Sequence, residues 1–105
     1  MPEQQPSPQP VDAIRQYLER EFPDQVRHTG WEPELQSHVF EIFHETGRHH
    51  QVLIGEGVMQ SNRDAVGDLR ESELVDYLRE AQAQTRRFHV RKEGGAVHVR
   101  SIKLT

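Results

Sequence analysis

Two turns that contain glycine, each between two runs of β-branched and aromatic residues, constrain this chain more than any other feature. Such runs favour extended backbone, and a two-residue turn with glycine joins neighbouring antiparallel strands. The sequence therefore predicts two β-hairpins. Their strands and turns are residues 37–45 and 48–56 around Thr46-Gly47, and residues 86–92 and 97–103 around Gly94-Gly95.

Two amphipathic helices are expected, one before the first hairpin and one between the hairpins. The first spans residues 11–22, and the second begins near Asp68 or Ser72, either of which is a suitable cap, and runs to about Ala83. In both, apolar residues recur at three- and four-residue steps, which places them on one helix face. The inward side chains are Val11, Ile14, Leu18 and Phe22 of the first helix, and Leu74, Leu78 and Ala81 of the second, with Val75 and Tyr77 at its flanks.

These elements predict an α+β fold, a two-layer sandwich in which an antiparallel sheet of four to five strands carries two helices on one face. The order is one helix, two or three strands, one helix and two strands, because residues 25–31 are a candidate edge strand. In residues 1–10, proline alternates with Gln, Ser and Glu. We expect this segment to be a flexible tail that folding does not require, and residues 11–105 to form a single domain.

Composition narrows the class of protein. The chain has 105 residues, of which 33% are hydrophobic and 29% charged, and a net charge of −4. So few apolar residues make a thin core, or one that a partner completes. The acidic balance disfavours nonspecific binding to nucleic acid or to anionic membranes. There are no cysteines, no apolar stretch of membrane-spanning length and no signal-peptide pattern, so we expect a cytoplasmic protein.

Positive charge is concentrated in the second hairpin. Residues 86–105 carry a net charge of +5, and the rest of the chain carries −9. With Gly94-Gly95 as the turn, cationic and histidine side chains share one side of the strands, whereas Phe88, Val90 and Val99 share the other. The predicted ligand- or partner-binding residues, which we call the basic ladder, are Arg87, His89, Arg91, His98 and Arg100.

Two interpretations of the basic ladder follow. In the first, it binds an anion such as nucleic acid, phosphate or an acidic protein segment, because an anion relieves the repulsion between like charges across the strands. In the second, Glu41, Glu45 or Glu56 on neighbouring strands neutralises the ladder within the sheet. Neutral histidine side chains also reduce the repulsion.

The first hairpin is apolar on both sides. A two-residue loop pairs His44 with His49 and Phe40 with Leu53, and a sheet covered by helices on one side is not expected to be apolar on both. The second side is covered either by the segment around Trp31 or Met59, or by a second copy of the chain. The predicted interface of the resulting homodimer is Phe40, Ile42 and Leu53.

Histidines offer a weak metal hypothesis. The candidate ligands are His38, His44 and His49, which this register brings to one side of the hairpin, where imidazoles can share zinc or copper. A solvated or partner-facing histidine cluster is the favoured interpretation, because no metal-binding spacing accompanies them. The sequence also lacks a phosphate loop and a nucleophile elbow, so we expect neither a cofactor nor an enzyme.

The sequence favours a cytoplasmic, non-catalytic protein-interaction or regulatory module that self-associates as a homodimer. The alternative is a weak nucleic-acid or anion-binding protein that uses the basic C-terminal hairpin. The order of elements resembles that of small secretion-chaperone-like proteins, which implies a small acidic chaperone-like dimer as a further alternative. In these 105 residues no pattern predicts the final helix that is usual in those dimers.

Overall fold

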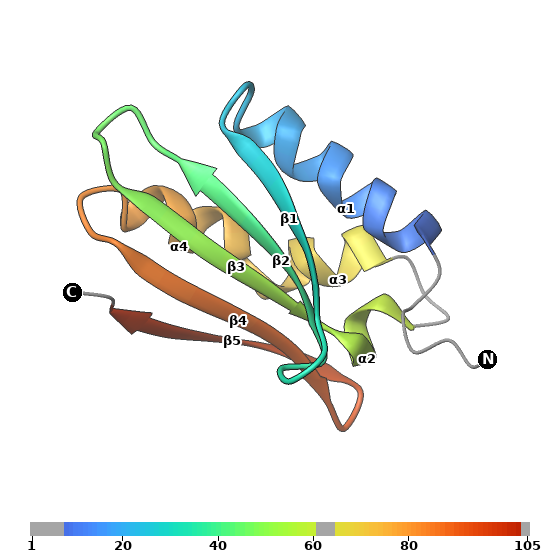
Figure 1. The fold of residues 1–105 in the computed structure, drawn as a ribbon. Helices are drawn as coiled ribbons and strands as arrows, with labels where there is room; N and C mark the ends of the chain where they lie inside the picture. The colour runs from blue at the N-terminus through green and yellow to red at the C-terminus, as the bar shows by residue number, and fades with distance from the viewer. Residues whose placement is uncertain (1–7, 61–64, 104–105) are drawn as a thin grey trace.

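The chain folds into a five-stranded sheet with helices on one face (Figure 1). This arrangement confirms the predicted α+β two-layer architecture. The computed structural model describes residues 8–60 and 65–103. The helices are α1 (Pro8–Glu21), α2 (Glu56–Met59), α3 (Ala65–Ser72) and α4 (Leu74–Glu80). The strands are β1 (Val26–Glu32), β2 (Ser37–Phe43), β3 (His49–Gly55), β4 (Arg86–Glu93) and β5 (Ala96–Lys103).

The strands lie side by side in chain order, β1-β2-β3-β4-β5. Neighbours are antiparallel except β3 and β4, which are parallel. The prediction of a wholly antiparallel sheet was therefore wrong at this one pair. Helices α2, α3 and α4 lie in the connection from β3 to β4, and a connection of that length can return the chain to the starting end of the sheet, as a parallel pair requires.

Helix α1 packs the predicted apolar face against the sheet. Val11, Ile14, Leu18 and Phe22 are all buried. The helix begins at Pro8, so residues 8–10 of the predicted tail form its first turn instead. Proline is tolerated there because the first turn of a helix has no carbonyl partners for its N–H groups. The other residues of the predicted tail, 1–7, lie outside the described part of the chain.

The predicted second helix is divided into α3 and α4. Glu73, between them, adopts a left-handed backbone with φ 62°. The Ser72 hydroxyl donates to the Leu69 carbonyl at 2.6 Å and accepts from the Leu74 N–H at 3.2 Å, so it links the end of α3 to the start of α4, whose N-cap position is Glu73. This break allows Leu69 of α3 and Leu74 of α4 both to be fully buried. None of the helices in the described ranges is long and apolar enough to cross a membrane.

Asp68 does not cap a helix, contrary to one of the two predictions for this region. It is 2% exposed, within α3, and its carboxylate lies 3.2 Å from the Lys92 ammonium of β4. A carboxylate can be buried at this depth when a cation compensates its lost hydration. The ion pair therefore ties α3 to β4.

The first hairpin has a longer turn than the sequence predicts. The His44 N–H donates to the Arg48 carbonyl at 2.9 Å, and the Gly47 N–H donates to the His44 carbonyl at 3.0 Å. These bonds enclose a three-residue loop, 45–47, in which Gly47 has the positive φ of 89° that closes a type I turn with a bulge. Phe40 therefore pairs with Val52 rather than with Leu53.

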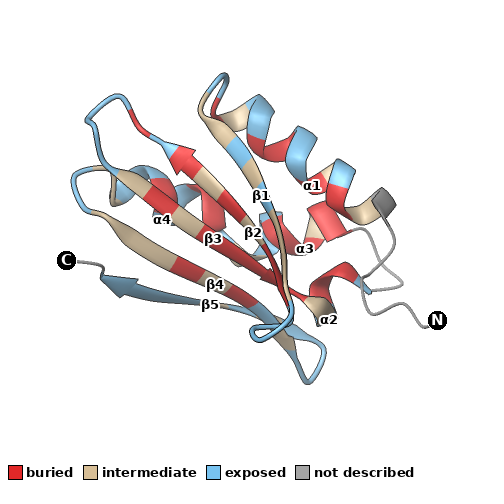
Figure 2. Cartoon of the chain, in the orientation of Figure 1, coloured by how far each residue is buried: buried red, intermediate tan, exposed pale blue. Residues whose placement is uncertain are grey.

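This one-residue change in register determines which side chains of β2 and β3 enter the core. A slip of one residue exchanges the faces of a strand relative to its neighbour. Apolar side chains of β2, β3 and β4 that face the helices are fully or almost fully buried (Figure 2). They are Phe40, Ile42, Val52, Ile54, Phe88 and Val90.

The second hairpin forms with the predicted register. Gly94 and Gly95 have φ 60° and 82°, the left-handed pair of a type I′ turn. Arg91 lies opposite His98, and His89 lies opposite Arg100. The predicted basic ladder is therefore confirmed as a set of cross-strand neighbours.

We expect Leu78→Ala to lower the free energy of unfolding by about 2–4 kcal/mol, because Leu78 is a fully buried core residue of α4. Tyr77→Ala in the same helix is the matched control, since Tyr77 is 43% exposed. Chemical denaturation measures both. Equal unfolding midpoints for the two variants would contradict the placement of α4.

Candidate binding surface

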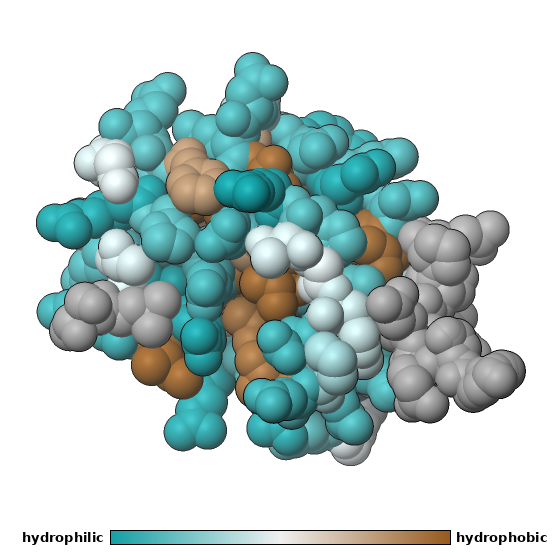
Figure 3. Space-filling view, viewed as in Figure 1, coloured by the Kyte–Doolittle hydropathy of each residue, from teal (hydrophilic) through white to brown (hydrophobic). Residues whose placement is uncertain are grey.

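The sheet face opposite the helices, which we call the open face, is not covered by any described element. Helices α3 and α4 lie behind the sheet in the view of Figure 1, and the space-filling view of Figure 3 looks onto the open face. An apolar band crosses its centre. Val39 of β2 and Leu53 of β3 are paired neighbours, and we call these two residues the apolar strip.

The predicted homodimer interface is divided between the two faces. Phe40 and Ile42 face the helices and are fully buried within one chain, so their assignment to a dimer interface was wrong. Of the three, only Leu53 lies on the open face, between Val39 and His89 in the register, and its side chain is also almost fully buried, at 2% exposed. The cause is the three-residue loop, which shifts β3 by one position relative to β2.

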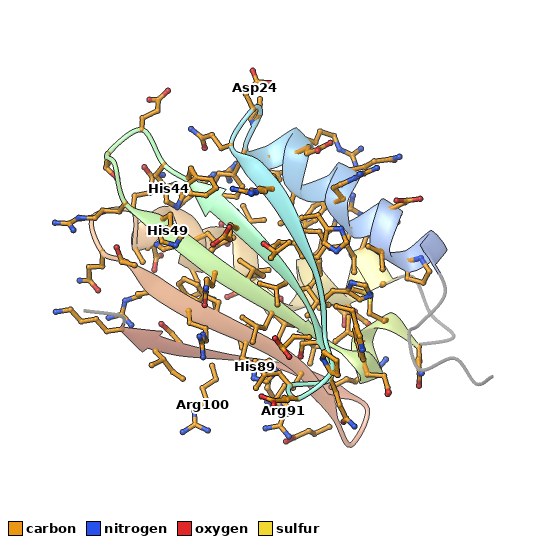
Figure 4. The ribbon with its side chains drawn as sticks, viewed as in Figure 1. Asp24, His44, His49, His89, Arg91 and Arg100 are labelled. Atoms are coloured by element: carbon orange, nitrogen blue, oxygen red, sulfur yellow. The ribbon has the colours of Figure 1, made fainter. Side chains whose placement is uncertain are left out.

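The basic ladder lies on the open face, beside the apolar strip. Arg87, His89 and Arg91 come from β4, and His98 and Arg100 come from β5. Figure 4 shows His89, Arg91 and Arg100 on the same side of the sheet, with Arg100 extending away from it. Strand alternation explains this grouping, because every second residue of two paired strands shares a face.

The acidic residues predicted to neutralise the ladder have other neighbours. Glu41 lies 3.8 Å from the His49 imidazole and accepts a hydrogen bond from Thr29 at 3.5 Å. Within the described ranges, no ion pair joins Glu41, Glu45 or Glu56 to a ladder residue. The second interpretation of the ladder therefore has no ion pair that supports it, although Glu56 lines the same groove as His89 and Arg91.

The ladder arginines have weak partners. Arg87 donates to the neutral Gln51 side chain at 3.0 Å. Arg91 lies 2.9 Å from Glu93 of its own strand, but both side chains are more than half exposed, and such pairs contribute little. Arg100 makes no ion pair with any described residue. The ladder thus presents positive charge that the fold does not use.

His89 is neutral at pH 7 in this environment. Burial lowers its pKa, and the positive charges of Arg91, Arg87 and Arg100 lower it further. Its Nε2 atom lies 3.2 Å from the Ser37 hydroxyl, which itself donates to the Leu35 carbonyl at 2.9 Å. His89 therefore donates to Ser37.

Ser37 is not a nucleophile in this arrangement. It is fully buried, and its proton is held by the Leu35 carbonyl. Nucleophilic catalysis requires an accessible hydroxyl whose proton a base can take. The Ser37–His89 pair instead fixes the turn between β1 and β2 against β4.

A groove of about 380 Å³ borders the ladder at this end of the sheet. Its walls carry both signs of charge, with Glu34 and Glu56 facing Arg91 and Lys92. The Lys92 ammonium is already paired with Asp68. The groove therefore extends the open face without adding a second concentration of free positive charge.

The three candidate metal ligands are not brought together. Among the described residues, no group of three or more His, Asp or Glu side chains is arranged to hold a metal ion. His38 is hydrogen-bonded to His28 at 3.2 Å, and His44 to His50 at 2.9 Å. His49 stacks on Phe43, with ring centroids 5.4 Å apart.

The His44–His50 pair is a neutral, buried hydrogen-bond chain. His50 Nε2 lies 2.9 Å from the Ala81 carbonyl and 3.0 Å from the Gln84 carbonyl, so it must donate. His50 Nδ1 then accepts from His44 Nε2. Burial and the neighbouring His50 lower the pKa of His44 to about 4, and burial also lowers the pKa of His50. The pair ties the β2–β3 turn to the segment after α4.

The His28–His38 pair lies among aromatic rings on the other half of the helical side. His28 stacks on Phe40 with ring centroids 4.7 Å apart, and His38 contacts Trp31 at 5.1 Å. Burial lowers the pKa of both imidazoles. The His38 Nε2 atom is buried without a hydrogen-bond partner, which makes this pair costly to the fold.

No protein-family model, curated protein or solved structure matches this chain. The open face and its side chains therefore carry the functional argument by themselves.

Sequence reasoning missed the apolar strip and both histidine pairs. The apolar strip and the His44–His50 pair depend on the register of the first hairpin, which was predicted one residue away from its true position, whereas the His28–His38 pair depends on the pairing of β1 with β2. The signal that could have found it is the loop Glu45-Thr46-Gly47, because three-residue hairpin loops place glycine at their last position.

We expect the protein to lose stability as the pH falls from 6.5 to about 4. His44 and His50 are neutral when folded but bind protons in the unfolded chain below pH 6.5. The unfolded state then holds more protons, so His44 lowers the free energy of unfolding by up to about 1.4 kcal/mol per pH unit in this window, and His50 acts in the same direction. Chemical denaturation at a series of pH values measures the slope.

His44→Gln is the matched variant, because glutamine retains a donor towards His50 but does not titrate. Its stability should fall less steeply than that of the unmodified protein between pH 6.5 and 5, where carboxylates are still ionised. Equal slopes for the two proteins would contradict the assigned role of His44.

Proposed function

We propose that this protein is a non-catalytic binding module whose open face binds an acidic, partly apolar segment of another protein. The observation that carries this proposal is the position of the basic ladder. It lies beside the apolar strip on a sheet face that no described element covers. Exposed cationic side chains such as Arg91 and Arg100 favour an anionic partner, and the partly exposed Val39 beside them offers an apolar contact.

Charge complementarity favours an acidic protein segment over nucleic acid. The chain outside residues 86–105 carries −9, which repels a long polyanion but tolerates a short acidic segment on the ladder. Single-stranded nucleic acid also needs aromatic side chains on which bases stack. Phe43 is the one exposed aromatic side chain on the open face within the described ranges, and it already stacks on His49.

A symmetric dimer through the open face is disfavoured by the same charges. A two-fold interface repeats the same residues from both copies, so it would bring two basic ladders together. A different, acidic partner removes this repulsion. We place this partner and the protein in the cytoplasm, because a chain without cysteine suits a reducing compartment.

The double variant Arg91→Glu, Arg100→Glu tests the proposal. The probe is a fluorescent peptide of alternating Glu and Val, with a Lys and Val peptide as its charge control. The unmodified protein should bind the acidic peptide and not the basic one, and the double variant should bind it at least about tenfold more weakly. Fluorescence anisotropy at constant salt measures both.

The matched control is Arg20→Glu, Arg48→Glu, which changes the net charge equally at exposed positions away from the ladder. This control should bind the acidic peptide almost as tightly as the unmodified protein. Thermal unfolding of both variants shows whether the fold is retained. Equal weakening by both pairs, or reduced stability with unchanged binding by the ladder pair, would contradict the proposed function.

A further inference from the structure

Strand β5 ends the sheet with an open edge. It pairs with β4 on one side, and no described strand lies on its other side. All eight of its residues pair in one continuous register, from Ala96 opposite Glu93 to Lys103 opposite Arg86. A regular edge of this length presents a row of backbone N–H and C=O groups that can pair with another strand.

The opposite edge of the sheet is different. Strand β1 has an irregularity between His28 and Gly30, where its register with β2 shifts. Bulges of this kind protect an edge because they twist it and interrupt its row of hydrogen-bonding groups. Strand β5 has neither a bulge nor a proline.

Charged side chains on β5 protect its edge against pairing with some strands but not with others. Its charged side chains are Arg100 and Lys103, both exposed. Positive charge on an edge repels basic strands but attracts acidic ones. The positive charge of this edge therefore favours pairing with a negatively charged strand.

We propose that an extended acidic segment of the partner protein binds as a sixth strand along β5. This inference rests on the proposed function, since it specifies how the acidic partner reaches the basic ladder. Main-chain hydrogen bonds to the edge supply affinity, and alternate side chains supply specificity.

The two faces of β5 predict the pattern of the segment. His98 and Arg100 lie on the open face, whereas Val97 and Val99 lie on the helical side and pack against the core. Side chains of an added strand continue the same alternation. Acidic residues should therefore occupy every second position, beside His98 and Arg100, and apolar residues the positions between them, beside Val97 and Val99.

A second copy of β5 does not satisfy these requirements. In an antiparallel pair centred on Val99, Arg100 of each copy would lie opposite His98 of the other. The pairing would also bring together two hairpins that each carry a net positive charge. Surfaces of like charge repel one another, which disfavours this pairing.

The geometry of the hairpin identifies the backbone groups involved. In a hairpin with a two-residue turn, the flanking residues Glu93 and Ala96 form a hydrogen-bonded pair, and such pairs then alternate along the ladder. The N–H groups of Val97, Val99 and Ser101 accordingly point to the open edge. Ser101 is exposed, so it can be changed with little effect on the core.

Ser101→Pro tests the inference, with Ser101→Ala as its matched control. Proline removes an N–H that points to the open edge, where the β4–β5 ladder does not need it. Alanine keeps that N–H and removes only the hydroxyl, which accepts a hydrogen bond from Arg86 at 2.8 Å. With the alternating Glu and Val peptide, Ser101→Pro should weaken binding at least about tenfold, and Ser101→Ala should not.

Two modified peptides provide a second measurement that does not depend on how Ser101→Pro folds. One carries N-methyl groups on its Glu residues and the other on its Val residues. In a strand, alternate N–H groups point to opposite edges, so one of the two peptides should lose binding and the other should retain it. Binding is measured by anisotropy with the unmodified protein.

The outcomes separate this inference from the proposed function. Loss of binding in Ser101→Pro, together with loss for one N-methylated peptide, supports the sixth strand. Equal binding of both N-methylated peptides, with binding still lost in Arg91→Glu, Arg100→Glu, overturns the sixth strand but leaves the acidic partner. Failure of every acidic peptide, or tighter ladder-dependent binding of a single-stranded oligonucleotide, overturns both.

Discussion

The turn at residues 45–47 sets the register of β2 against β3, and most of the structure depends on that register. The positive φ of Gly47 closes a three-residue loop rather than a two-residue loop. Phe40 and Ile42 consequently share the helical side with Val52 and Ile54, and together they form a core with α1, α3 and α4. The same register leaves Val39 and Leu53 on the open face, beside the cations of β4.

Two buried polar pairs on the helical side hold the helices and the first turn against the sheet, and burying these groups costs free energy. The Asp68–Lys92 pair ties α3 to β4, and the His44–His50 pair ties the first turn to the segment after α4. Histidines in such positions are stable only while they are neutral, because burial penalises their charged forms. The core of this small domain is therefore most stable near and above neutral pH, where its imidazoles need no counter-charge.

The parts of the fold that follow from local chemistry could be predicted from the sequence. Gly94-Gly95 specifies a two-residue turn, so the pairing of His89 with Arg100 and the position of the ladder followed directly. The face of α1 followed from the spacing of Ile14 and Leu18. These features depend on neighbours within a few residues.

The parts that depend on tertiary packing could not be predicted in the same way. Glu73 takes a left-handed backbone because α3 and α4 must both reach the sheet, and glutamate gives no sign of this in the sequence. The parallel pairing of β3 with β4 arises because the helical connection returns the chain to the end of the sheet where β3 begins. The apolar strip was misplaced by a single position, because register exchanges whole faces of a strand.

The functional account depends on one surface, formed by the apolar strip, the basic ladder and the free edge of β5. Residues from four strands, β2 to β5, contribute side chains to it. Such a division between a packed face and an exposed face is what allows a small two-layer domain to bind a partner without refolding.

The most direct test of the central claim is an NMR titration of the isotope-labelled protein with the alternating Glu and Val peptide. The account predicts that backbone amide shifts change along β4 and β5 and around Val39 and Leu53, while those of α1 and α4 remain constant. Shift changes confined to the helical side, or distributed evenly over the molecule, would contradict it.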